Sequence, residues 1–285
     1  MAFVNQALLK RGWAVVGDAF RHFTADDGWA MASHVALSAL MAVFPFVIFV
    51  AALAGFIGQE RLAAGVAGIL FQTWPAEVAG PIATEVQQVV QQARVSLMTL
   101  SALAAVVLAA NGVEAVRTAL SRAYRVVDRR PIVFRLAQSV ALVLAGAVAS
   151  LALAFVVLVG PMLLETVTAA VPALKPYQDE FYLARYAVPA AVVVVVLAVS
   201  HLWLPAGRPR WHWLWPGMLL TLVMWVIAAM IFAVYVRRFA VLATTYAGLA
   251  SVFTAIFFLY AVAVSLIFGA EFNAALGRMR AGRIG

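Results

Sequence analysis

Six long stretches of this sequence contain no Asp, Glu, Lys or Arg, and this pattern limits the possible folds more than any other feature. The charge-free stretches are residues 28–59, 95–113, 136–164, 186–207, 211–236 and 239–270. A bilayer has a hydrocarbon core about 30 Å thick, which about 20 apolar residues of helix can cross. Lipid offers the backbone no hydrogen-bond partner, so each crossing segment must be helical. The sequence therefore predicts an all-α integral membrane protein with six transmembrane helices and additional amphipathic interfacial helices.

The composition agrees with a single integral membrane domain over residues 1–285. The chain is 66% hydrophobic and 11% charged, whereas soluble domains are about 45–50% apolar and about 25% charged. We expect residues 1–27 to form a cytoplasmic interfacial helix, because apolar residues recur there at helical spacing beside basic ones. Residues 60–94 are expected to form an extracytoplasmic amphipathic connection. The six spans are expected at about 30–58, 95–117, 137–164, 184–204, 212–236 and 246–270.

The net charge of +8 is explained by membrane topology. With the N-terminus inside, 14 of the 20 Lys and Arg residues fall on the inner side, while the 12 acidic residues divide equally. An excess of Lys and Arg marks cytoplasmic loops, so both termini are predicted to be cytoplasmic. The arginines between Arg117 and Arg135 are then explained by topology and contact with anionic lipid, with a dedicated ligand site as the alternative. No nucleic-acid partner is expected.

The few polar residues of the predicted spans gather near the cytoplasmic side. Such groups often face a bundle interior or a wet cavity, so they are candidates for the lining of a substrate path. Pro45 joins them because a mid-span proline removes a backbone hydrogen bond and should kink or break the helix, although membrane helices also use proline for packing alone. The candidate path residues are His34, Pro45, Asn111, Glu114, Glu271 and Asn273.

Each candidate also has a structural explanation. Glu114 and Glu271 can pair with nearby arginines such as Arg117 or Arg278. His34 and His201 can make hydrogen bonds between helices. Two histidines without a helical i, i+4 partner are a weak signal for a metal, so no metal site is predicted.

Three arginines are candidates for contact with an anionic headgroup. Arg122, Arg125 and Arg129 would lie on one face if the second span continued as a helix beyond residue 117. Arginine donates two hydrogen bonds at once to a phosphate, which suits this role. The same arrangement would suit ordinary bilayer phosphates. Membrane lipids, including an anionic lipid substrate, are the expected partners.

Several motifs together resemble the YihY/BrkB family of bacterial inner-membrane proteins, some of which carry the older name ribonuclease BN. They are the segment 23–28 before the first span, Phe44-Pro45, Arg129-Arg130-Pro131, Leu204-Pro205, and the segments 246–249 and 269–274. Where many relatives have Ala-Tyr and a serine before the proline, this chain has Ala36-Leu37 and Ala42. The resemblance implies a six-helix inner-membrane fold and a transport-like role in the envelope, such as lipid export.

Three function classes follow. The first is a transporter or lipid-translocating protein, which the resemblance, Pro45 and the inner polar residues favour. The second is a membrane scaffold without transport activity. The third is a ribonuclease, for which the sequence offers no paired carboxylates suited to Mg²⁺ and no basic-aromatic RNA module. No catalytic residue and no cofactor is predicted, and an enzyme is not expected.

Overall fold

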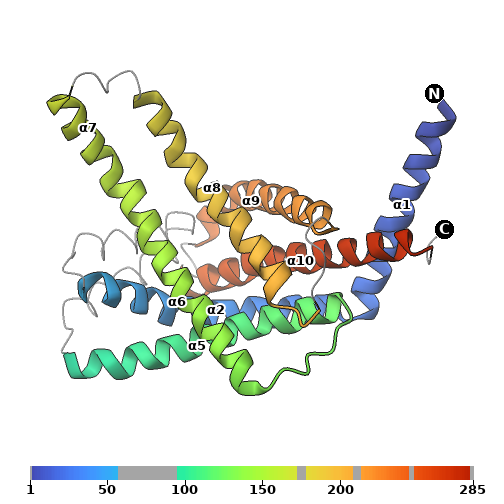
Figure 1. Cartoon of the computed structure of the whole chain (residues 1–285), viewed down its shortest axis with the longest axis horizontal. Coiled ribbons are helices and arrows are strands. Elements are labelled where there is room, and N and C mark those ends of the chain that lie inside the picture. The colour runs from blue at the N-terminus through green and yellow to red at the C-terminus, as the bar shows by residue number, and fades with distance from the viewer. Residues whose placement is uncertain (1, 57–94, 172–177, 208–212, 244–246, 283–285) are drawn as a thin grey trace. The chain divides into compact units, whose positions relative to one another are not determined.

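The computed structural model describes residues 2–56, 95–171, 178–207, 213–243 and 247–282, and all regular structure within these ranges is helical. The predicted all-α class is thus confirmed for the described chain (Figure 1). The helices are α1 (Ala2–Ala25), α2 (Gly28–Phe56), α5 (Val95–Ala123), α6 (Ile132–Ala154), the π-helix η1 (Phe155–Val159), α7 (Gly160–Ala170), α8 (Gln178–Trp203), α9 (Trp215–Ala243) and α10 (Ala247–Arg280).

Within the described residues, each of the six predicted spans overlaps one of these helices or the continuous run α6–η1–α7. By length and composition, three described segments can cross a membrane, namely Ile132–Val157, Trp215–Tyr235 and Phe253–Arg280. Two shorter apolar helical segments are Gly28–Val43 and Ala187–Trp203. The chain is therefore a helical protein suited to a membrane, and the number of six spans stays a prediction. The predicted connection 60–94 lies outside the described residues.

The chain divides into two compact units. The first contains the described residues of 1–40, 114–135 and 197–285, and the second contains those of 41–113 and 136–196. In the first unit α10 packs along α9 and also contacts α1 (Figure 1). In the second unit the helices meet in two apolar clusters, one around Val50 and Ala147 and the other around Ala110 and Val143. Phe46 of α2 packs against both of these clusters.

The apolar face of α1 is turned towards the protein. Val15, Ala19 and Phe23 are almost fully buried, and the first two form a cluster with Ala275 of α10. Trp13 and Phe20 are exposed on the same helix. A helix was predicted at residues 1–27 and α1 is observed at Ala2–Ala25, but Val15, Ala19 and Phe23 of its apolar face are core residues. The exposed aromatic side chains are the ones available to a membrane interface.

Two small residues bring α9 and α10 close together. A Cβ atom added to Gly217 would lie 2.2 Å from the carbonyl oxygen of Gly269, and one added to Gly269 would lie 2.0 Å from Oγ1 of Thr221. Thr221 donates hydrogen bonds to the carbonyls of Gly217 and Ser265, at 2.9 and 3.3 Å. Helices in membranes use small residues in this way, because close approach increases van der Waals contact.

Prolines within the helices have different local consequences. The π-helix η1 ends at Val159, two residues before Pro161, and the Gly160 N–H donates to the carbonyl of Phe155, five residues earlier. Pro161 has no N–H to continue the α-helical pattern, which gives a physical reason for the wider turn. In contrast, α2 continues from Gly28 to Phe56 through Pro45. Of the kink or break predicted at Pro45, a break is therefore absent, and the adjacent Phe46 packs against both apolar clusters of this unit.

Candidate functional site

The C-terminus of α5 determines how the basic connection between α5 and α6 is arranged. The Arg125 N–H donates to the carbonyl of Arg122 at 2.9 Å, and the Val126 N–H donates to that of Ser121 at 2.9 Å. These two bonds form a Schellman motif, in which the residue after the helix end adopts the left-handed conformation. Arg125 occupies that position with a φ of 55°.

The single helix face predicted for Arg122, Arg125 and Arg129 is therefore wrong. The helix ends at Ala123, so Arg125 and Arg129 lie in the non-helical connection. The residue that follows a helix in the left-handed conformation is usually glycine. No glycine stands at this position, so the sequence did not indicate that the helix ends here. The role of these arginines in headgroup contact stays a prediction.

A network of ion pairs surrounds the buried carboxylate of Glu271. Its side chain is 1% exposed and lies 3.3 Å from Arg125 and 3.9 Å from Arg278. Arg125 also pairs with Asp26, and Arg278 pairs with Asp18 at 2.7 Å. The network connects α1, the α1–α2 turn, the end of α5 and α10. The structural explanation for Glu271, pairing with an arginine such as Arg278, is thus confirmed.

A second polar cluster lies at Asn273. Its Oδ1 accepts a hydrogen bond from the Gly217 N–H at 2.7 Å, and its Nδ2 donates to the Leu214 carbonyl at 3.0 Å. Nδ2 also lies 3.5 Å from the hydroxyl of Tyr124, which is 2.7 Å from Nδ1 of the buried His201. His201 was predicted to bond to another helix, and its partner Tyr124 lies in the turn directly after α5, so the bond joins α8 to the end of α5.

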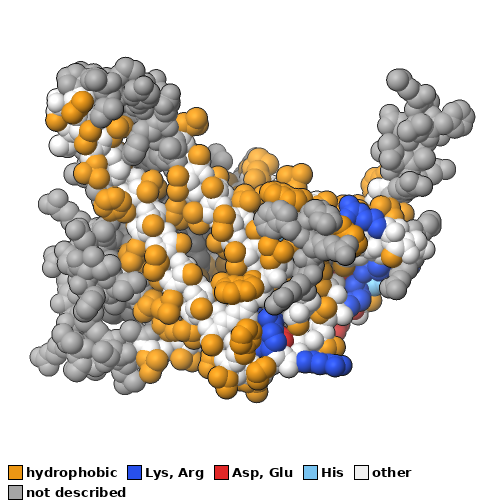
Figure 2. Space-filling view, viewed as in Figure 1, with side chains coloured by type: hydrophobic (Ala, Val, Ile, Leu, Met, Phe, Trp, Pro, Cys, Tyr) orange, Lys and Arg blue, Asp and Glu red, His pale blue; other side chains and the backbone are white. Residues whose placement is uncertain are grey.

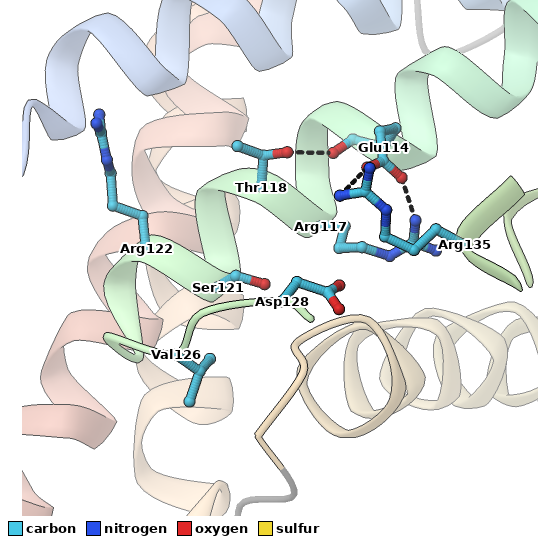
Figure 3. A pocket seen from close by; sticks show the side chains of 8 residues that line it. All are labelled: Glu114, Arg117, Thr118, Ser121, Arg122, Val126, Asp128 and Arg135. Carbon is cyan, nitrogen blue, oxygen red and sulfur yellow. Dashed lines mark hydrogen bonds and ion pairs between the residues drawn. The ribbon is translucent and has the colours of Figure 1, made fainter. Parts of the chain in front are cut away.

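A cavity opens beside the end of α5, and we call it the α5–α6 cavity (Figure 3). Its volume is about 340 Å³. Glu114 lies at one side of it, paired with Arg117 and, at 3.3 Å, with Arg135. The predicted pairing of Glu114 with Arg117 is confirmed. The cavity is lined by Glu114, Arg117, Thr118, Ser121, Arg122, Val126, Asp128 and Arg135.

The remaining candidate path residues are His34, Asn111 and Pro45. His34 is exposed on α2, and Asn111 is exposed on α5. Asn111 and Pro45 belong to the second unit, whereas Glu114, Glu271 and Asn273 belong to the first. Glu114 and Glu271 pair with different arginines, so the structure places them in two ion-pair groups. The idea of a common polar lining stays a prediction.

Sequence reasoning missed Asp18, Tyr124 and Ser121. Asp18 accepts from Arg21 at 2.8 Å, and the i, i+3 spacing of this pair is visible in the sequence. Tyr124 stands out only through its contacts with His201 and Asn273, which are distant in the sequence, and Ser121 only through its place beside the α5–α6 cavity. No local pattern marks them.

Ion pairing also shifts the pKa of groups in the connection and in α1. A hydrogen bond from Arg130 holds the pKa of Asp128 below its usual value and raises the pKa of Arg130 itself. For Asp18, burial raises the pKa, but hydrogen bonds from Arg278 and Arg21 outweigh it and the pKa is lowered. Burial raises the pKa of the Tyr124 phenol. Both aspartates are thus charged, and their pairs are formed, at neutral pH.

The surface of the described helices is largely apolar. Large hydrophobic side chains are exposed on α2, α5, α6, α8, α9 and α10, and they cover much of the face seen in Figure 2. In a water-soluble protein, such contiguous exposure would be unusual. All ion pairs found among the described residues lie in the first unit. Within the described ranges, no group of three His, Asp or Glu residues is arranged to hold a metal ion.

Comparison with known proteins places the chain in a family. Residues 19–284 match the family described as virulence factor BrkB. The putative ribonuclease-like protein YfkH of Bacillus subtilis (strain 168) is 23% identical over 261 residues, covering 92% of this chain and 94% of that protein. The UPF0761 membrane protein RC1_0578 of Rhodospirillum centenum (strain ATCC 51521 / SW) is 24% identical over 279 residues, covering 95% of this chain and 59% of that protein. No solved structure matches significantly. With its apolar helices and a family match over almost its whole length, this chain belongs to the BrkB family of membrane proteins.

Proposed function

We propose that this protein is a transporter or lipid-translocating protein of the bacterial inner membrane, acting in envelope biogenesis. Its substrate would be an amphipathic, anionic lipid. Both termini and the α5–α6 connection would face the cytoplasm, as the distribution of Lys and Arg favours.

The observation that carries this proposal is the combination of side chains on the α5–α6 connection and on the adjoining ends of α5 and α6. Arg122 and Arg129 are exposed. Beside them in the chain, Val127, Ile132 and Val133 are 80%, 73% and 78% exposed. Arginine binds phosphate through two hydrogen bonds, and exposed aliphatic side chains favour acyl chains over water. The connection therefore offers both kinds of contact that an anionic lipid requires.

Pro45 supplies the second part of the proposal. It lies inside α2, where it leaves the carbonyl of Met41 without its usual helical donor. Such a position lowers the free energy needed to bend the helix and lets backbone carbonyls face a passing polar group. In this proposal the arginines bind the headgroup, and α2 bends near Pro45 as the lipid crosses the membrane.

Two other functions, a membrane scaffold and a ribonuclease, predict different experimental results. A membrane scaffold would use the same apolar helices without moving lipid. A ribonuclease activity is suggested by the name of the Bacillus subtilis relative. Cleavage of RNA by the purified protein would favour the ribonuclease, and a lack of any lipid movement would favour the scaffold.

The test is lipid flip-flop in proteoliposomes that contain a fluorescent phosphatidylglycerol, quenched from outside by a membrane-impermeant reductant. The intact protein should accelerate flip-flop. The double substitution Arg122→Gln with Arg129→Gln should slow it, and so should Pro45→Ala. Arg21→Gln is the matched control, because Arg21 is an exposed arginine on α1, and its rate should stay unchanged. Equal rates in empty and protein-containing vesicles would overturn the proposal.

A further inference from the structure

The α5–α6 cavity contains a buried serine hydroxyl that lacks a partner. Ser121 is 7% exposed, and its Oγ has no hydrogen-bond partner among the described residues. One helical turn earlier, Thr118 follows the usual pattern and donates to the carbonyl of Glu114 at 2.9 Å. In the close view, the Ser121 hydroxyl instead points along the cavity towards Asp128 (Figure 3). A buried hydroxyl without a partner lowers stability unless a ligand or water satisfies it.

A second donor at the cavity is also unsatisfied. Nε of Arg135 is buried and has no hydrogen-bond partner among the described residues, while its Nη1 lies 3.3 Å from Glu114. Arg135 thus remains fixed by its ion pair and still presents an N–H group that nothing in the described chain accepts. Two unsatisfied donors, one of them on a cation, thus belong to residues that line the same cavity.

The two carboxylates that line the cavity are already occupied. Glu114 pairs with Arg117 and Arg135. Asp128 accepts from the Arg130 side chain at 2.8 and 2.6 Å and from the Arg130 backbone N–H at 3.0 Å. Their negative charges are therefore compensated. The groups left for a ligand are the two donors, Ser121 Oγ and Arg135 Nε. The lining residues also carry one positive charge in excess.

Unsatisfied donors beside arginines suit an oxyanion. Among oxyanions, phosphate matches the guanidinium fork and accepts several hydrogen bonds at once. A volume of about 340 Å³ exceeds that of a bare phosphate ion and lies at the lower end of the range for small-molecule sites. The space suits a phosphate that carries a small organic group.

We propose that the α5–α6 cavity binds a phosphate ester, with Ser121 Oγ and Arg135 Nε donating hydrogen bonds to its oxygens. The ester is either the headgroup of a phospholipid or a small soluble phosphate ester. The site stands on the cavity alone and does not require that the protein moves lipid. The site is tested by ligand binding and the proposed transport by lipid flip-flop, so a negative result for one proposal is distinguishable from a negative result for the other.

The test is a calorimetric titration of the full-length protein in micelles of an uncharged, phosphate-free detergent. The probes are sn-glycerol 3-phosphate, a short-chain phosphatidylglycerol, and the diacylglycerol of the same chain length, which lacks the phosphate. Ser121→Ala removes one donor, and Arg135→Lys removes Nε while keeping the charge beside Glu114. Each should raise the dissociation constant about tenfold, because each removes a hydrogen bond to a charged group. Ser150→Ala is the matched control, because Ser150 of α6 is not among the residues that line the cavity and its hydroxyl already donates to the carbonyl of Gly146 at 2.8 Å.

The results separate the sources of the phosphate. Binding of both phosphate probes, weakened in the two variants and kept in the control, supports a general phosphate-ester site. Binding of phosphatidylglycerol alone with the same variant effects supports a lipid headgroup site. The proposal is overturned if neither phosphate probe binds, if diacylglycerol binds as tightly as phosphatidylglycerol, or if both variants bind like the unchanged protein. Equal thermal unfolding midpoints of the variants in micelles exclude misfolding as the cause of weaker binding.

Discussion

At the scale of single residues, Asn273 completes the start of another helix. The first N–H groups of a helix have no acceptor within the helix, and Gly217 belongs to the first turn of α9. Asn273 accepts from this N–H and donates to the Leu214 carbonyl, both in a buried position. One side chain of α10 thus fixes where α9 begins.

Replacing Asn273 with Ala should lower the free energy of unfolding by about 1–3 kcal/mol, because the buried Gly217 N–H loses its acceptor. Denaturant unfolding in micelles measures this change. Asn111→Ala provides a matched control, since Asn111 is exposed and its replacement should change stability by less than about 0.5 kcal/mol. Equal effects of the two substitutions would contradict the role given to Asn273.

Asp128 gives a prediction about pH. Its pKa is lowered in the folded protein by the hydrogen bond from Arg130, so folding is favoured wherever the carboxyl is ionised. This contribution is fully present above the ordinary pKa of Asp and disappears as the pH falls through the lowered value. Asp128→Asn should therefore unfold at a lower temperature at neutral pH, and the difference should shrink as the solution is acidified. A difference that stays constant with pH would argue against the charged pair.

Sequence alone identified several residues of these clusters but not their partners. Glu114, Glu271 and Asn273 were noticeable because polar groups are rare in apolar spans. Their contacts with Arg135, Arg125 and Gly217 depend on packing, which a single sequence does not contain. Ser121 was overlooked because an unpartnered hydroxyl is a property of the folded surroundings.

At the scale of helices, the contact between α9 and α10 depends on two glycines. The Cβ of an alanine at position 217 would lie 2.2 Å from the Gly269 carbonyl oxygen, which belongs to the backbone and cannot turn away. The two helices would have to separate. At Gly277 of α10, apart from its own chain neighbours and the adjoining backbone of the helix, no atom lies within 4 Å of the added Cβ.

Gly217→Ala should therefore destabilise the protein by about 1–3 kcal/mol through overpacking. Gly277→Ala should leave stability unchanged or raise it by up to about 1 kcal/mol, because alanine favours helix over glycine. Thermal unfolding of both variants in the same micelles compares them directly. If Gly217→Ala were as stable as Gly277→Ala, the close approach of α9 and α10 would be refuted.

The positions of the helices were predictable from the sequence, and their ends were less so. The stretches without charged residues indicated the helix positions. Lipid disfavours charged groups and offers the backbone no hydrogen-bond partners, so a crossing segment is apolar and helical. The end of α5 was not predicted, because the residue with the left-handed conformation there is Arg125 and not the usual glycine. This conformation is unfavourable for arginine, and ion pairs with Asp26 and Glu271 offset it. Such compensation arises between residues far apart in the sequence.

At the scale of the whole molecule, the account depends on the side of the membrane that each connection occupies. The lipid-moving role requires the arginines of the α5–α6 connection to face the cytoplasm. The distribution of Lys and Arg predicts this side, and the same threading places residues 60–94 outside. The described helices are compatible with this path, because each predicted span overlaps a described helix.

The most direct test is a topology map in bacterial cells. Green fluorescent protein, which fluoresces in the cytoplasm, and alkaline phosphatase, which is active outside it, are fused in parallel to both termini and inserted within 60–94 and after Arg129. The account predicts fluorescence at the termini and after Arg129, with phosphatase activity only within 60–94. Phosphatase activity after Arg129, or at either terminus, would contradict the six-span arrangement with a cytoplasmic α5–α6 connection.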